Sequence, residues 1–97
     1  MYEITVEELI NVFENDNAVL IDVREKDEFA EISLEEAINI PLGQISYYEG
    51  DKSKDIYLIC RTGNRSGQAC KILSAKGYKA YNVLGGMEEW KKFTESI

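Results

Sequence analysis

Hydrophobic and polar positions along the chain form blocks that predict short strands alternating with short helices. Residues 18–21 and 55–59 are mostly apolar, as in strands that are buried on both faces. Weaker strand patterns lie at residues 2–4, 37–40 and 81–84. This alternation of elements favours an α/β layer fold.

The predicted helices lie between these strands. Thr5 and Glu8 have the spacing of a capping box at the start of a helix. The apolar stripe of that helix consists of Val6, Leu9, Ile10 and Phe13. A longer helix begins at Ser66 and ends before Gly77, because glycine suits the position just after a helix. Other helical segments are residues 26–30, a weak turn at 45–48, and residues 87–93, where Trp90 falls on the apolar face.

Length and composition fit one globular domain at residues 1–97, with 44% hydrophobic and 30% charged residues. The N-terminus is acidic, and no apolar run follows that could form a signal peptide or a membrane span. We therefore expect a cytoplasmic protein without a membrane partner. The net charge of −7 opposes nucleic-acid binding, which requires clustered lysine and arginine.

The chain contains no histidine, which excludes an imidazole base, a Cys–His pair and a His-ligated zinc. We expect no metal and no other cofactor. Without a secretory signal, the two cysteines, Cys60 and Cys70, are expected to be thiols rather than a disulfide. Cys70 falls within a helix and is expected to pack in the core. Cys60 directly follows the apolar run at 55–59, at the carboxyl end of a predicted strand.

The segment after Cys60 combines features that activate a thiol. A loop that leads into a helix at Ser66 would turn several backbone N–H groups inward, and the helix N-terminus adds partial positive charge. Two of the three arginines in the chain, Arg61 and Arg65, lie in this loop. Such surroundings favour the thiolate, so Cys60 is the candidate nucleophile in an anion-binding cradle. Asp22, at the end of another strand, is expected either to cap a local turn or to brace this loop.

Four segments, in order along nearly the whole chain, resemble the rhodanese family. The loop Cys60-Arg61-Thr62-Gly63-Asn64-Arg65-Ser66 resembles the active-site loop of that family. Residues 20–25 are similar to its Asp-Val-Arg strand end, residues 37–41 to its Ala-x-Asn-Ile-Pro segment, and residues 85–90 to its C-terminal Gly-Gly-x-x-x-Trp signature. Residues 32–37 depart from the family pattern, because many members have Gly-His-Ile-Pro-Gly-Ala there.

The resemblance implies a doubly wound α/β fold with a central, mostly parallel five-stranded sheet and helices on both faces. It also implies a sulfurtransferase. The Cys60 thiolate would take a sulfane sulfur from thiosulfate or a similar small anionic donor, become a persulfide, and pass the sulfur to cyanide or another thiol. Arg61 and Arg65 would bind the donor, and the other substrate-binding positions would be Thr62, Gly63, Asn64 and Ser66.

Other functions remain open from the sequence. The same loop suits a persulfide carrier that hands sulfur to a relay partner, or a rhodanese-like module that binds proteins without turnover. A cysteine phosphatase or an arsenate reductase is disfavoured. The phosphatase signature places five residues between cysteine and arginine, whereas four separate Cys60 from Arg65.

Overall fold

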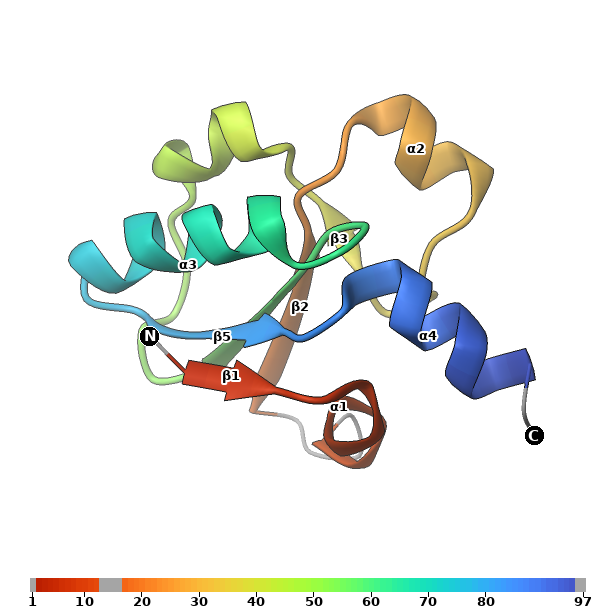
Figure 1. The fold of residues 1–97 in the computed structure, drawn as a ribbon. Helices are drawn as coiled ribbons and strands as arrows, with labels where there is room; N and C mark the ends of the chain where they lie inside the picture. The colour runs from red at the N-terminus through yellow and green to blue at the C-terminus, as the bar shows by residue number, and fades with distance from the viewer. Residues whose placement is uncertain (1, 13–16, 96–97) are drawn as a thin grey trace.

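The sheet at the centre of the structure has five strands, and all neighbouring strands are parallel (Figure 1). The computed structural model describes residues 2–12 and 17–95. Within them the strands are β1 (Tyr2–Ile4), β2 (Ala18–Asp22), β3 (Ile38–Asn39), β4 (Asp55–Ile59) and β5 (Lys79–Val83). Their order across the sheet is β1-β5-β4-β2-β3. The strand patterns in the sequence are thus confirmed, with differences only at their ends.

Helices cover both faces of this sheet. They are α1 (Val6–Val12), α2 (Lys26–Glu31), α3 (Asn64–Ala75) and α4 (Gly86–Glu95), together with the 3₁₀ helix η1 (Leu42–Tyr47). Helix α3 and η1 pack together on one face, whereas α1 and α4 pack together on the other. The structure therefore confirms the doubly wound α/β fold that the resemblance implied.

Successive residues of the central strand β4 join two separate core clusters. Ile56 and Leu58 belong to the cluster under α3, whereas Tyr57 and Ile59 belong to the cluster under α1 and α4. Side chains alternate between the two faces of a strand, and here both faces are covered by helices. Both sets must therefore be apolar, which explains the continuous apolar pattern in the sequence.

The predicted capping box opens α1. The Glu8 N–H donates to Thr5 Oγ1, and the Thr5 N–H donates to Glu8 Oε1, each at 3.1 Å. Of the apolar stripe of this helix, Val6 and Leu9 are buried, Ile10 is exposed, and Phe13 lies outside the described residues.

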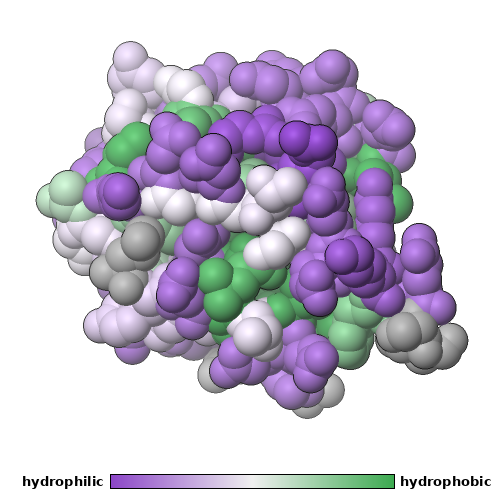
Figure 2. Space-filling view, viewed as in Figure 1, coloured by the Kyte–Doolittle hydropathy of each residue, from purple (hydrophilic) through white to green (hydrophobic). Residues whose placement is uncertain are grey.

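Cys70 and Trp90 lie where their spacing predicted. Cys70 is fully buried in the cluster under α3, and Trp90 packs, partly buried, against the other cluster. The surface in Figure 2 is mostly hydrophilic, with a hydrophobic patch between the end of β1 and α4. None of the helices in residues 2–12 and 17–95 is long and apolar enough to cross a membrane.

Candidate active site

Cys60 lies directly after β4, at the carboxyl edge of the sheet, and its side chain is buried with 1% exposure. The neighbouring strand β2 ends at Asp22, which is in register with Ile59. Parallel α/β sheets bind ligands at this edge, beyond the carboxyl ends of the strands. The fold therefore brings Cys60 and Asp22 to the same edge, as the sequence predicted.

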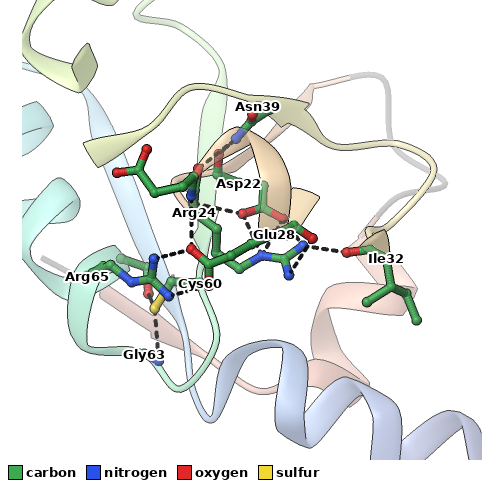
Figure 3. A network of polar contacts seen from close by, with 10 residues as sticks. Asp22, Arg24, Glu28, Ile32, Asn39, Cys60, Gly63 and Arg65 are labelled. Carbon is green, nitrogen blue, oxygen red and sulfur yellow. Dashed lines mark hydrogen bonds and ion pairs between the residues drawn. The ribbon is translucent and has the colours of Figure 1, made fainter. Parts of the chain in front are cut away.

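The segment from Cys60 to Ser66 wraps around the Cys60 sulfur (Figure 3). The Gly63 N–H donates to Sγ at 3.1 Å, and the Ser66 hydroxyl oxygen lies 3.3 Å from Sγ. Gly63 has a φ of 106°, which glycine adopts without strain, and it is the N-cap of α3. Because Gly63 ends the turn, α3 begins at Asn64, two residues before the predicted start at Ser66.

These contacts make Cys60 more acidic than an ordinary cysteine. Burial acts to raise the pKa of the thiol, but the Ser66 hydroxyl and the backbone of Ser66, Gly63 and Thr62 stabilise the thiolate, so that the pKa lies below its usual value. In Cys70 burial acts without such donors and raises the pKa to about 12. These surroundings favour the thiolate at Cys60 and the thiol at Cys70, which leaves Cys60 as the candidate nucleophile.

Asn82, near the end of β5, joins the site although its sequence position gave no signal. Its Nδ2 donates to the Gly63 carbonyl at 3.1 Å, and its Oδ1 accepts a hydrogen bond from the Ser66 hydroxyl at 2.5 Å. Both Ser66 and Asn82 are buried. Asn82 therefore links the start of α3 to the middle of the Cys60 loop.

The first turn of α4 holds the other side of the loop. The Met87 N–H donates to the Cys60 carbonyl at 2.8 Å, and the Glu88 N–H donates to the Arg61 carbonyl at 3.0 Å. Gly86 has a φ of 55° and lies so close that a Cβ there would come within 2.8 Å of the Arg61 carbonyl. The Gly-Gly signature thus lets a helix N-terminus approach the active loop.

Asp22 forms its hydrogen bonds with Arg24 rather than with the Cys60 loop. The Arg24 side chain donates to both Asp22 carboxylate oxygens at 2.7 to 3.1 Å, and both residues are buried. The same guanidinium donates to the carbonyls of Glu28 and Ile32. The pair therefore fixes α2 and the start of the segment that departs from the family pattern, as Figure 3 shows.

Arg65 pairs with a carboxylate that the sequence did not single out. Its two terminal nitrogens donate to Glu28 Oε1 and Oε2 at 2.6 and 3.0 Å. The hydrogen bond from Arg65 is the largest cause that lowers the pKa of Glu28 to about 2. The hydrogen bond to Glu28 is also the main cause that raises the pKa of the Arg65 guanidinium, and negative charge on the nearby Cys60 raises it further. The cation beside Cys60 is thus already paired within the protein.

The other predicted loop residues face solvent. Arg61, Thr62 and Asn64 are exposed. A cavity of about 320 Å³ lies beside the loop and contains side chains of both charges. It is lined by Arg24, Glu28, Glu31, Ile32, Arg61, Met87, Glu88 and Lys91. The cavity beside the loop is therefore mixed in charge rather than uniformly positive.

The fold and the loop together define a class of protein: a doubly wound parallel α/β domain with an acidic cysteine held by hydrogen-bond donors at the carboxyl edge of the sheet. The chain belongs to the rhodanese-like domain family, whose model matches residues 5–93.

Known proteins resemble this chain in both sequence and structure. YtwF of Bacillus subtilis (strain 168), which carries a sulfurtransferase name, is 44% identical over 78 residues that cover 78% of this chain and 76% of YtwF. The thiosulfate:glutathione sulfurtransferase of Saccharomyces cerevisiae is 30% identical over 90 residues, covering 76% and 65% of the two chains. The crystal structure of a rhodanese-like domain protein from Staphylococcus aureus matches with a TM-score of 0.86 at 34% identity, covering 93% and 91%. These similarities support a rhodanese-like sulfurtransferase or sulfur carrier.

Proposed function

We propose that this protein transfers sulfane sulfur from thiosulfate or a similar anionic donor to a thiol or cyanide acceptor, through a persulfide on Cys60. The observation that carries the proposal is the buried Cys60 sulfur, which receives the Gly63 N–H and lies beside the Ser66 hydroxyl. These donors stabilise negative charge on sulfur without a histidine, which the chain lacks.

The reaction has two displacement steps. In the first, the Cys60 thiolate attacks the outer sulfur of thiosulfate. A sulfur–sulfur bond forms to Cys60 while the bond to the inner sulfur breaks, and its electron pair leaves with sulfite. In the second, an acceptor thiolate or cyanide attacks the outer sulfur of the persulfide and restores the Cys60 thiolate. Electrons balance within each step, so no further oxidant or reductant is needed.

Arginine side chains in the loop would attract the anionic donor. Arg61 is exposed and lines the cavity, so its guanidinium would meet a ligand there, whereas Arg65 would bind the donor only in competition with Glu28. Thr62 and Asn64 would shape the exposed side of the loop, where the donor would approach. The loop amides would hold the charge that develops on the persulfide and on sulfite.

A sulfur carrier in the cytoplasm that exchanges sulfur with a relay protein is the second candidate. The mixed charge of the cavity beside the loop favours it over a site for small anions alone, because a protein surface can complement both signs. Both candidates use the same Cys60 persulfide. A phosphatase is disfavoured. The guanidinium of Arg65, which is the arginine that its signature would use to hold a phosphoryl group at the cysteine, pairs with Glu28 instead.

Mass spectrometry of the Cys60→Ser and Cys70→Ser variants tests the proposal. After treatment with thiosulfate, the wild type and the Cys70 variant should each gain one sulfur atom, and the Cys60 variant should gain none. The rate of thiocyanate formation with cyanide should follow the same pattern. Cys70 is the matched control, because it is the other thiol of the chain and lies buried in α3. Equal loss of sulfur uptake in both variants would overturn this assignment of roles, and uptake that persists in the Cys60 variant would show that Cys60 is not the carrier.

A further inference from the structure

The Ser66 hydroxyl lies within hydrogen-bond distance of two groups but has only one proton to donate. Its oxygen is 2.5 Å from Asn82 Oδ1 and 3.3 Å from Cys60 Sγ. The orientation of the Asn82 amide follows from its other contact, because the Gly63 carbonyl can only accept and so requires Nδ2 beside it. Oδ1 therefore faces Ser66 and accepts its proton.

This arrangement suits a protonated Cys60. While the Ser66 hydroxyl donates to Asn82 Oδ1, its oxygen can accept a hydrogen bond from the Cys60 S–H. Both the Cys60 proton and the Ser66 proton then have an acceptor. A thiolate has no proton and can only accept. The Ser66 hydroxyl must then turn to the sulfur and leave Asn82 Oδ1 without that donor. Ser66 is fully buried and Asn82 is 8% exposed, so water replaces the lost bond poorly.

We propose that Asn82 is a positioning residue which competes with the Cys60 thiolate for the Ser66 proton and so balances Cys60 between a resting thiol and the reactive thiolate. The inference rests on the proposed function, in which the thiolate is the attacking species. When Cys60 carries a persulfide, the negative charge moves to the outer sulfur, and the Ser66 proton returns to Asn82. When an acceptor removes the outer sulfur, Ser66 turns again to the departing Cys60 thiolate.

The charged groups around Cys60 come from several elements, and the substitutions in the test below leave all of them unchanged. Arg65 on α3 pairs with Glu28 on α2, and Asp22 at the end of β2 pairs with Arg24. The side chains of Arg61 in the loop and of Glu88 and Lys91 on α4 line the neighbouring cavity. The chain has no histidine, so the ultraviolet absorbance of the thiolate between pH 5 and 9 reports Cys60, while Cys70 with its pKa near 12 stays protonated.

The test is the Cys60 pKa, read from thiolate absorbance, in the full chain without any sulfur donor. Asn82→Ala removes the competing acceptor and should lower the Cys60 pKa by about 0.5 to 1, a 3- to 10-fold shift toward the thiolate. Ser66→Ala removes the shared proton and should raise the Cys60 pKa. In the Ser66→Ala background the Asn82→Ala change should then have no further effect.

A merely structural Asn82 gives the opposite pattern. If its only role is to hold the Gly63 carbonyl, the alanine variant loosens the Gly63 N–H and raises the Cys60 pKa, with or without the Ser66 hydroxyl, and that result would overturn the inference. Should the alanine variant not fold, Asn82→Val, which suits a strand and also lacks the amide, replaces it. Loading of the wild type by thiosulfate is followed in parallel by mass. Failure to load would refute the proposed function alone, whereas a pKa that does not fall in the Asn82 variants would refute the inference alone.

Discussion

Replacing Gly86 by alanine should distort the loop that begins at Cys60, although Gly86 itself lies in α4. The added Cβ would lie 2.8 Å from the carbonyl carbon and oxygen of Arg61 and closer still to the Cys60 carbonyl oxygen. Ordinary contacts of a Cβ begin near about 3.4 Å, so the backbone on one side must move by roughly 1 Å to relieve the contact with the Cys60 carbonyl oxygen. The φ of 55° adds a left-handed strain of about 1–2 kcal/mol for a residue with a Cβ. Loosening of the hydrogen bonds from α4 to the two carbonyls adds about 1 kcal/mol each.

The expected total is a loss of about 3–4 kcal/mol in the free energy of unfolding, measured by urea denaturation. Sulfur transfer should fall further, by on the order of 100-fold, because a nucleophile misplaced by about 1 Å loses that much rate. The assay is thiocyanate formation per folded molecule. Gly43→Ala in η1 is the matched control, since a Cβ there meets no atom within 4 Å. A Gly86 variant as stable and as fast as the Gly43 variant would refute the view that α4 holds the loop.

Two further predictions concern the ion pairs around the site. In Arg65→Ala the partner of Glu28 is lost. The pKa of Glu28 is about 2 in the folded protein against an ordinary 4.5, so the pair stabilises the fold above about pH 4.5, and this contribution disappears as the pH falls toward 2. Because each side chain is 31% exposed, the wild type should exceed the variant by only about 1 kcal/mol in urea denaturation at pH 7, and a difference that persists unchanged at pH 2 would contradict this account. Asp22→Asn leaves the buried Arg24 guanidinium without its counter-charge and should cost about 3–5 kcal/mol in the same assay. Asp55→Asn is the control, because Asp55 forms a longer ion pair of 3.8 Å with the exposed Lys79, and it should cost less than about 1 kcal/mol, so equal losses would argue against burial as the cause.

The strands could be predicted from the sequence because the fold imposes a simple requirement on them. A strand covered on both faces must be apolar at every position, as residues 56–59 of β4 are. For α3 the sequence predicts a start at Ser66, two residues later than the start at Asn64 in the structure. Asn64 belongs to the helix, but the sequence does not show that Gly63 takes a left-handed φ and completes the turn before it.

The cysteine and the loop around it could also be found in the sequence, because one segment of seven residues contains them. Glu28 and Asn82 could not. Glu28 is one of 18 acidic residues and lies 37 positions before Arg65, and only the folded arrangement of α2 and α3 selects it. Asn82 lies in β5 among apolar residues, and its position in the strand pattern indicates only a side chain packed in the core. Its role depends on the pairing of β4 with β5, which brings it beside the start of α3.

The difference between the two thiols decides what becomes of a sulfur atom placed on Cys60. In many thiol proteins a second cysteine attacks such a sulfur species and closes a disulfide, and the attacking form must be a thiolate. With a pKa of about 12, Cys70 is ionised in only about one molecule in 100,000 at pH 7, and its side chain is fully buried in α3. Within the described residues, no second thiol can therefore attack a persulfide on Cys60 and release its outer sulfur as sulfide. If Cys60 carries sulfur as proposed, the loaded protein would keep that sulfur until an acceptor outside the protein removes it.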